Sequence, residues 1–337
     1  MPNVDARISG IASGRRTWLV TGGAGFIGSH LVDRLLTLGQ RVRVLDNFET
    51  GRRTNLESAA KVHGESLEVI DGDIRSLDAC RAAAQGSDVI LHQAALGSVP
   101  RSILDPLTTH ATNVTGFLNV LWAAREHGIR RVVYASSSSV YGDHPGLPKE
   151  EDLIGRQLSP YAVSKYSNEL YAHAFGLAYG MELLGLRYFN VFGPRQDPSG
   201  PYAAVIPVWF QSLLQGSTVF VNGDGTTSRD FCFVENVVQA NLLAATTDRA
   251  EAIGKVYNVA VGDRTRLLEL FEAIRTQVAL LRPGAANAHP VHRDERAGDV
   301  RHSLADISRA RRLLGYEPTV KVAEGLARAA EWYLASP

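Results

Sequence analysis

A tyrosine and a lysine four residues apart are the clearest candidates for chemistry in this chain. Tyr161 and Lys165 would lie on one face of a helix, and the preceding Ser159 and Pro160 suit its N-cap and first helical position. A tyrosine normally titrates near ~10, but a lysine ammonium one turn away favours the phenolate and makes tyrosine a usable acid or base. The spacing therefore predicts a tyrosine with a lowered pKa in a redox enzyme.

A run of hydroxyl side chains, Ser136–Ser139, comes before this pair, and Ser137 lies 24 residues before Tyr161. The run directly follows an apolar stretch, Arg131–Ala135, that is typical of a buried strand. Ligands of parallel sheets bind at the carboxyl ends of the strands, so we expect these hydroxyls at a binding site. The alternative is a polar turn capped by Gly142.

Glycines recur at positions 22, 25 and 28, after one strand and at the start of a helix. Such a triplet permits a tight turn, a close approach of the backbone to a pyrophosphate, and close packing of helix on strand. The helix N-terminus would then face the phosphates. Because the strand–turn–helix context is met, the pattern favours a dinucleotide-binding loop over a plain turn.

Asp46 ends the next strand, 18 residues after Gly28. A carboxylate there accepts the hydroxyls of an adenosine ribose, which favours NAD over NADP. The nearby Arg52 and Arg53 are counter-evidence, since arginines can receive a 2′-phosphate, but we interpret them as a solvated loop pair. Asp73 follows the third strand and could meet the adenine edge or form a turn.

Strands and helices alternate through the first half of the chain, which predicts an α/β fold with a doubly wound parallel Rossmann sheet. A smaller C-terminal α/β substrate lobe would follow. We expect a dinucleotide-binding domain at residues 1–189, with 234–262 returning to it, and a lobe at 190–233 and 263–337. The expected strands are Thr17–Thr21, Val42–Leu45, Leu67–Ile70, Val89–Leu91, Arg131–Ala135, Leu183–Tyr188 and Lys255–Val259. The expected helices are Phe26–Leu38, Asp78–Ala84, Asp105–His127, Tyr161–Tyr179, Glu235–Ala245, Leu304–Leu314 and Val322–Leu334, with a loop at Arg282–Asp299.

The composition is that of an ordinary globular protein of 337 residues, 45% of them hydrophobic. Thirty-five basic residues balance thirty-five acidic ones, which argues against nucleic acid or an anionic membrane as a partner. Two cysteines, an N-terminus without a signal-peptide pattern and the lack of a long apolar run predict a cytoplasmic protein. His289 and His292, with Asp294 and Glu295, lie in a predicted loop and are not expected to bind metal.

Several motifs together resemble the extended short-chain dehydrogenase/reductase family. They are the glycine loop, the serine run with Val140-Tyr141-Gly142, Tyr161-x-x-x-Lys165, Leu186–Pro194, Asn222–Gly225, Arg229–Phe231 and Tyr257–Val259. The resemblance extends from about Thr17 to Leu334. Within the family the chain is most similar to bacterial UDP-N-acetylglucosamine/UDP-N-acetylgalactosamine 4-epimerases, through His92–Ser102 and Tyr202–Pro207.

The resemblance implies roles for individual residues. Ser137 would contact the reacting sugar hydroxyl, Tyr161 would be the acid/base, and Lys165 would bind the nicotinamide ribose and lower the pKa of Tyr161. Sugar C4 would give hydride to NAD, and the resulting 4-keto sugar would receive it back on its other face, without net redox change. The implied cofactor-binding residues are Gly22, Gly25, Phe26, Ile27, Gly28, Asp46, Asn47, Gly51, Asp73, Ile74, Gln93, Ala94, Ala95, Tyr161 and Lys165.

The implied substrate is a UDP-sugar. Its binding residues would be Gly97, Ser98, Ser138, Ser139, Asn190, Ala204, Val205, Trp209, Phe220, Asn222, Arg229, Arg296, Asp299 and Ser303. Arg229 and Arg296 would bind the diphosphate, or else form salt bridges with Asp230 and Glu295. Trp209 and Phe220 would line the pocket or form the lobe core.

Three residues narrow the reaction. Dehydratases of the family carry an acid where this chain has Ser138 and Ser139, which argues against elimination. Ser303 stands where epimerases restricted to non-acetylated sugars tend to carry a tyrosine, so it leaves room for an N-acetyl group, although it could also be an N-cap.

Other functions stay open at this level. The same scaffold could act on UDP-glucose/galactose or UDP-uronic acids, or the chain could be a non-catalytic NAD-binding sensor or scaffold. The resemblance also implies a homodimer that pairs Asp105–His127 and Tyr161–Tyr179 of two copies.

Overall fold

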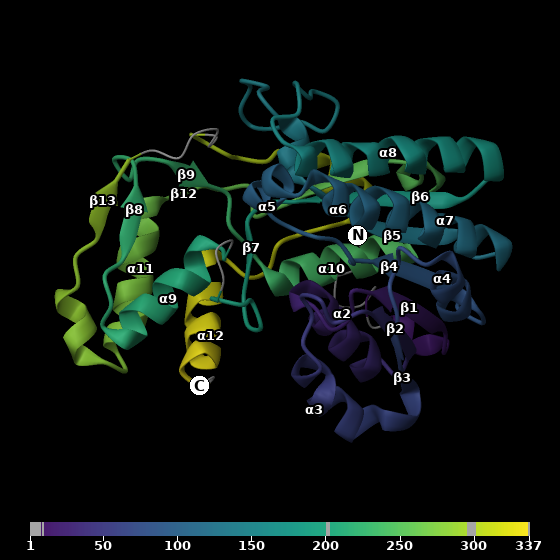
Figure 1. Cartoon of the computed structure of the whole chain (residues 1–337), viewed down its shortest axis with the longest axis horizontal. Coiled ribbons are helices and arrows are strands. Elements are labelled where there is room, and N and C mark those ends of the chain that lie inside the picture. Colours follow the sequence, from purple (N-terminus) through teal and green to yellow (C-terminus); the bar gives the residue numbers. More distant parts are fainter. Residues whose placement is uncertain (1–7, 9, 200–202, 295–300, 336–337) are drawn as a thin grey trace.

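The computed structural model describes residues 8, 10–199, 203–294 and 301–335. At the centre of this part of the chain lies a sheet of seven parallel strands in the order β11-β6-β5-β4-β1-β2-β3 (Figure 1). The strands are β1 (Thr17–Thr21), β2 (Arg41–Asp46), β3 (Leu67–Asp71), β4 (Val89–His92), β5 (Arg131–Ser137), β6 (Glu182–Tyr188) and β11 (Val256–Val259). The chain order reverses between β1 and β4, where sheets of this kind bind nucleotides. The predicted Rossmann sheet and its strands are confirmed.

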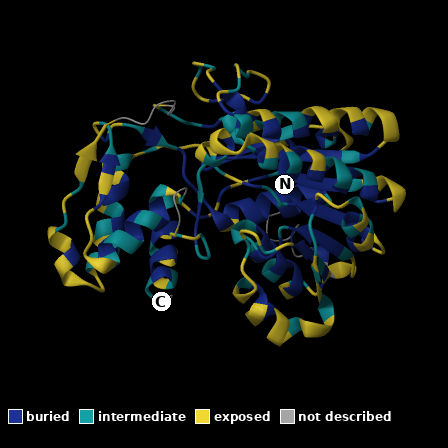
Figure 2. Ribbon diagram, in the orientation of Figure 1, coloured by how far each residue is buried: buried dark blue, intermediate teal, exposed yellow. Residues whose placement is uncertain are grey.

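Helices cover both faces of the sheet, so its central strands are buried on both sides, whereas the edge strand β3 is partly exposed (Figure 2). Along β1, Trp18 and Val20 pack into the cluster that includes α2 (Phe26–Thr37), α3 (Thr54–His63) and α10 (Val234–Thr246). Leu19 points the other way, toward α4 (Leu77–Ala84) and α7 (Gly116–Glu126), and α8 (Pro160–Tyr179) lies on the same face. This alternation explains the nearly continuous apolar strands of the sequence.

The predicted helix Asp105–His127 is confirmed as one helical run with an irregular middle. It consists of α6 (Pro106–His110), the π-helical η3 (Ala111–Thr115) and α7. A short helix, α5 (Val99–Leu104), comes before it, and the turns η1 (Gly10–Ser13), η2 (Gly64–Ser66), η4 (Ser138–Tyr141) and η5 (Ala250–Ala252) lie in other connections. Among the helices that the structure describes, none is long and apolar enough to cross a membrane.

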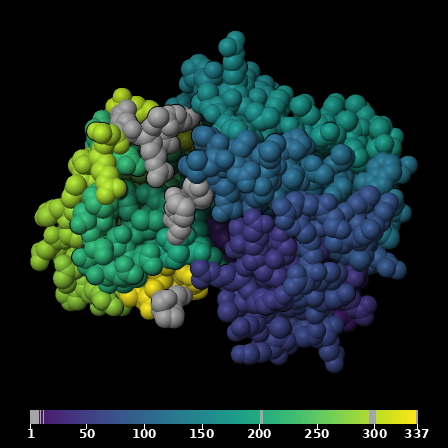
Figure 3. All heavy atoms as spheres, in the orientation of Figure 1, coloured from purple at the N-terminus to yellow at the C-terminus, as the bar shows by residue number. Residues whose placement is uncertain are grey.

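A second hydrophobic cluster lies beside the sheet and joins α9 (Val205–Gln215), α11 (Leu267–Ala279) and α12 (Val322–Ala335). Figure 3 shows these green-to-yellow segments gathered on one side of the purple-to-blue N-terminal half. Three strand pairs accompany them: β7 (Val191–Phe192) with β10 (Cys232–Phe233), β8 (Phe220–Asn222) with β13 (Val291–Arg293), and β9 (Ser228–Arg229) with β12 (Thr265–Arg266). The two-part arrangement agrees with the predicted substrate lobe, and the residue boundaries of the domains stay a prediction.

Two expectations for the C-terminal third are wrong in detail. The expected loop Arg282–Asp299 contains η6 (Pro283–Asn287) and β13, because Val291 pairs with Phe220 of β8. The expected helix Leu304–Leu314 shrinks to η7 (Ala310–Leu314), because the backbone before it is tied to the lobe: the N–H of Ala305 donates to Asp230.

Candidate active site

The start of α8 places Tyr161 and Lys165 against the sheet. The Oγ of Ser159 accepts a hydrogen bond from the N–H of Ala162 at 3.1 Å, and Pro160 is the first helical residue, as predicted. Tyr161 is half-buried and Lys165 is buried, and both line a cavity at the carboxyl end of β5. The N-cap therefore determines the point at which the helix begins, and with it the place of Tyr161.

Lys165 is held in the protein interior, with 2% of its surface exposed. Its Nζ donates to the carbonyl oxygen of Ala135 at 2.9 Å, which attaches α8 to β5. Burial disfavours the ammonium and lowers the pKa of Lys165 to about 8. The side chain is thus a cation near the edge of deprotonation.

The pKa of Tyr161 differs from the sequence-based expectation. Burial raises it above its ordinary value, and the hydrogen bond with Ser137 offsets this in part. The prediction that Lys165 brings the tyrosine to a low pKa is therefore wrong for the protein surroundings taken alone. Desolvation of the phenolate outweighs what the neighbouring side chains supply.

Ser136 and Ser137 of the serine run have different hydrogen-bond partners. Ser137 accepts hydrogen bonds from the N–H of Ser139 at 3.2 Å and from its Oγ at 2.9 Å. The hydroxyl proton of Ser137 is then available for Tyr161. Ser136 also lines the cavity, but its Oγ donates to Oε1 of Glu169 on α8 at 2.6 Å. The alternative of a simple polar turn is not sufficient to describe this arrangement.

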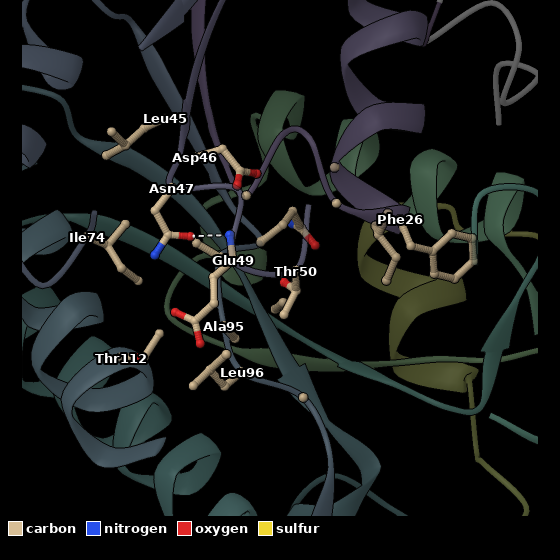
Figure 4. Close-up of a pocket in the computed structure, with 18 of the residues that line it drawn as sticks. Phe26, Leu45, Asp46, Asn47, Glu49, Thr50, Ile74, Ala95, Leu96 and Thr112 are labelled. Atoms are coloured by element: carbon tan, nitrogen blue, oxygen red, sulfur yellow. Dashed lines mark hydrogen bonds between the residues drawn. The ribbon is translucent and has the colours of Figure 1, made fainter. Parts of the chain in front are cut away.

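A cavity of about 320 Å³ lies along the carboxyl ends of the central strands (Figure 4). It brings together the predicted residues Gly22, Gly25, Phe26, Ile27, Gly28, Asp46, Asn47, Asp73, Ile74, Gln93, Ala94, Ala95, Gly97, Tyr161 and Lys165. Sequence reasoning missed Leu45, Glu49, Thr50, Gly72, Leu96, Thr112, Ala135, Ser136 and Tyr188. Most of these are neighbours of residues that were found, so extending each strand-end motif by one or two positions would have identified them. The predicted Gly51 lies outside this set, and a Cβ there would come within 2.9 Å of Asp46 Oδ1.

The glycine loop has no room for side chains at Gly22 and Gly28. Gly22 has a φ of +69°, and a Cβ on it would lie 2.7 Å from the backbone of Ala94. A Cβ on Gly28 would lie 2.0 Å from the carbonyl oxygen of Gly22. Only glycine fits at these two positions. The loop leads into the N-terminus of α2, where backbone N–H groups suit a pyrophosphate. The residues present therefore fit a dinucleotide.

Asp46 is positioned by the loops on either side of it. Its Oδ2 accepts from the N–H of Ala24 at 2.9 Å and its Oδ1 from that of Phe48 at 2.8 Å, while burial raises its pKa. Figure 4 shows Asp46 at the cavity with Asn47 beside it, whose Oδ1 accepts from the N–H of Glu49 at 3.0 Å. The predicted ribose-binding carboxylate thus faces the cavity.

The arginines that favoured NADP are paired elsewhere. Arg52 forms an ion pair with Asp197 at 2.6 Å, and Arg53 forms one with Asp71. Asp73 lines the cavity but is held by Arg75, whose guanidinium lowers the pKa of that carboxyl to about 2. The pairing of Arg52 and Arg53 agrees with the preference for NAD.

The predicted substrate residues are spread over the lobe and the end of β5. Ser98 is the N-cap of α5 with a φ of +105°, and the Nδ2 of Asn190 donates to the carbonyl oxygen of Asp230 at 3.0 Å. Ser138 and Ser139 form η4, whereas Ala204 and Val205 stand at the start of α9 and Asn222 ends β8. Their common role stays a prediction.

Several of these residues have structural neighbours that bear on the alternatives. Trp209 is buried in the lobe core and its Nε1 donates to the carbonyl oxygen of Phe220 at 3.2 Å, so the core interpretation is the better one for Trp209. Phe220 is partly exposed, with the guanidinium of Arg293 over its ring. Arg296 and Asp299 lie outside the described residues.

Ser303 is not an N-cap, because the helical turn η7 begins well after it. Its N–H instead donates to the carbonyl oxygen of Ser228 at 3.0 Å, next to Arg229. Asp230, which the sequence analysis did not assign to the site, explains this arrangement. Its carboxylate accepts from the N–H groups of Val261, Gly262 and Ala305, and burial raises its pKa to about 7. It thereby ties the segments that carry Arg229 and Ser303 to the end of β11.

The fold and this site define a class of α/β enzyme that binds a dinucleotide beside a tyrosine and a buried lysine. The sequence profile described as the NAD dependent epimerase/dehydratase family matches residues 18–260. The chain belongs to this family, and its cofactor is NAD. The resemblance to the extended short-chain dehydrogenase/reductases is confirmed.

Individual relatives agree with this assignment. The chain is 40% identical over 317 residues to a UDP-glucose 4-epimerase of Mycolicibacterium smegmatis, covering 94% of this chain and 97% of the relative. Among solved structures it is similar to a UDP-N-acetylglucosamine 4-epimerase from Methanobrevibacter ruminantium, with a TM-score of 0.89, 38% identity and coverage of 96% and 99%. It is also similar to a UDP-glucuronic acid 4-epimerase from Bacillus cereus in complex with UDP-glucuronic acid and NAD, with a TM-score of 0.83, 29% identity and coverage of 95% and 99%.

Proposed function

We propose that this enzyme catalyses the reversible, NAD-dependent epimerisation of a UDP-N-acetylhexosamine at C4. The observation that carries the proposal is the pair of Tyr161 and the buried Lys165 at the same cavity as the glycine loop. Such a pair needs a hydroxyl to deprotonate and a hydride acceptor beside it, which is the requirement of a sugar alcohol meeting a nicotinamide.

The residues of the chain have separate tasks in this reaction. The glycine loop and Asp46 would hold NAD, which would supply reversible hydride exchange at C4 without net redox change. Tyr161 takes the proton from the 4-hydroxyl and gives it back. Ser137 holds the phenol in place and stabilises the phenolate by its hydrogen bond. The buried ammonium of Lys165, one turn away, adds positive charge on the same side.

The N-acetyl preference rests on Ser303 and on the likeness to the M. ruminantium enzyme. Ser303 has a small side chain and lies beside the strand end that carries Arg229, our candidate for the diphosphate. Ser138 and Ser139 offer no acid for an elimination. The runner-up is a 4-epimerase of UDP-glucose or a UDP-uronic acid, which the relatives from M. smegmatis and B. cereus favour.

Proton NMR of the sugar signals tests the substrate. Purified protein with NAD is expected to convert UDP-GalNAc to a mixture with UDP-GlcNAc, and to do so faster than it converts UDP-galactose or UDP-galacturonic acid. Equal or faster turnover of the non-acetylated or uronic sugars would contradict the N-acetyl assignment and leave the C4 chemistry intact. Accumulation of a keto or dehydrated product, or no turnover of the three sugars, would contradict epimerisation itself.

We also propose that two copies associate through α6 and α8. Val163, Leu170 and Leu177 repeat every seven residues and form an exposed apolar stripe along α8. Leu107 of α6, 82% exposed, lines a surface cavity with Val163. Soluble helices rarely leave such a stripe in water, so a two-fold partner with the same stripe would bury it. Figure 2 shows the exposed outer side of α8.

Light scattering after size exclusion tests this interface. The wild-type protein is expected to have twice the chain mass, and Leu107→Glu combined with Leu177→Glu is expected to shift it to a monomer, because two charges would be buried per copy. Val62→Glu is the matched control, since Val62 is equally exposed but lies on α3. A monomeric wild-type protein, or a double variant that stays dimeric, would contradict the proposal.

We assign the enzyme to the cytoplasm, in agreement with two buried, free cysteines.

A further inference from the structure

The polar contact behind the serine run joins the catalytic strand to the catalytic helix a second time. Glu169 lies one helical turn beyond Lys165 and two turns beyond Tyr161, so the three share a face of α8. Lys165 donates to Ala135, and Glu169 accepts from the next residue, Ser136, at 2.6 Å. Two successive residues of β5 are thus attached to α8 immediately before Ser137.

Glu169 is a buried carboxylate with its own counter-ion. Arg187 of β6, only 2% exposed, donates to Oε1 of Glu169 from Nε at 2.9 Å and to Oε2 from Nη2 at 2.7 Å. Its Nη1 donates to the carbonyl oxygen of Glu151 at 2.9 Å, and its guanidinium lies over the ring of Tyr141 at 4.8 Å. The pair therefore joins α8, β5, β6 and the segment before α8 in one rigid assembly.

Stability alone gives little reason for this pair. Replacing a buried ion pair with apolar side chains of similar volume is often neutral or stabilising. Glu169 and Arg187 also lie outside the set of described residues that line the cavity. If they contribute to the reaction, they act through Ser136.

We infer that Ser136, Glu169 and Arg187 form a positioning device that fixes Ser137 relative to Tyr161. The inference rests on the proposed acid–base role of Tyr161. The device sets the spacing between the end of β5 and the start of α8, and the spacing sets the Ser137–Tyr161 bond. Because that bond lowers the pKa of Tyr161, loosening the device raises the pKa of the tyrosine and moves the acid limb of the kcat–pH profile to higher pH.

Ser136→Ala is the minimal test, since it removes one hydroxyl and leaves the Glu169–Arg187 pair in place. We expect kcat to fall about tenfold with KM changed less than twofold, because a misplaced reacting group lowers the rate without weakening binding. The acid limb of the kcat–pH profile should move to higher pH. Glu169→Met with Arg187→Met removes the pair without leaving an unpaired charge, and we expect the same change in a protein with nearly unchanged melting temperature.

The control pair lies at the other end of the same two strands. Arg131 at the start of β5 donates to Glu182 of β6, with an Nη2–Oε2 distance of 2.6 Å. Glu182→Gln should lower the melting temperature without shifting the pH profile. A shift of equal size in this control, or an unshifted profile in Ser136→Ala, would overturn the inference.

A second measurement separates this inference from the proposed function. NMR of protein carrying 13C-labelled tyrosine and bound NAD gives the pKa of Tyr161, whose signal is identified by its loss in Tyr161→Phe. The pKa is expected to be higher in Ser136→Ala than in the wild type, whatever sugar the enzyme uses. Equal values in the two proteins would overturn the inference even if epimerisation is established, while a failed epimerase assay with a raised value would refute only the function.

Discussion

Tyr161→Phe is expected to lower kcat by about 10³-fold or more, within the range that removal of a general acid–base group produces. Phenylalanine keeps the ring in the cavity and deletes the hydroxyl that meets Ser137. The sugar hydroxyl then has no group to receive its proton, while the surfaces that hold NAD are unchanged. Turnover of UDP-GalNAc by NMR and the amount of NAD retained after purification are the two measurements.

The matched control is Tyr171→Phe. Tyr171 belongs to the same helix but is exposed, so its hydroxyl should matter neither for turnover nor for NAD. Turnover of Tyr161→Phe within a few-fold of wild type would remove the tyrosine from the acid–base role. Loss of NAD together with activity would indicate that the ring position, and not the proton transfer, had been disturbed.

The parts of the site that depend on local sequence were predictable. Ser159 and Pro160 start α8 as expected, and the glycines at 22 and 28 occupy positions where a Cβ would collide with backbone. Both follow from the backbone preferences of single residues. The NAD preference followed from Asp46 at a strand end, and the pairing of Arg52 with Asp197, far away in the sequence, supports it.

The parts of the site that depend on burial were not predictable from the sequence. Spacing shows that Tyr161 and Lys165 share a helix face, but it does not show how dry that face is. In the folded protein desolvation dominates both pKa values and raises that of the tyrosine. For the same reason the sequence did not show that Trp209 is a core residue, because its place in the lobe core depends on α9 packing against α11.

Two of the lobe helices, α9 and α11, were not predicted, although the sequence of α9 carries a usable signal. In α9, Ile206, Trp209, Phe210 and Leu213 recur at helical spacing and all are buried. Asp230 is different, because its three backbone partners come from two distant loops and no local pattern points to them.

Lys165→Met is expected to abolish turnover and at the same time to stabilise the protein measured without cofactor. The lowered pKa of Lys165 means that burial of the ammonium lowers the free energy of unfolding by about 3 kcal/mol at neutral pH. Methionine has a similar length and no charge, and it gives up the hydrogen bond to Ala135, which contributes about 1 kcal/mol. The net gain in the free energy of unfolding near pH 7 is therefore about 2 kcal/mol.

The pH dependence identifies the cause. The pKa of Lys165 is about 8 in the folded protein against an ordinary 10.5, so between these values the unfolded chain holds the proton more tightly. Wild-type stability therefore gains with rising pH in this window, whereas Lys165→Met lacks that gain. In urea unfolding the advantage of the variant should shrink from pH 7 toward pH 10, and the exposed Lys61→Met should show neither effect. A difference in the free energy of unfolding that stays constant from pH 7 to pH 10 would mean that burial does not lower the pKa of Lys165. Greater stability together with lost turnover in Lys165→Met would show that Lys165 serves the proposed reaction at a cost to the fold.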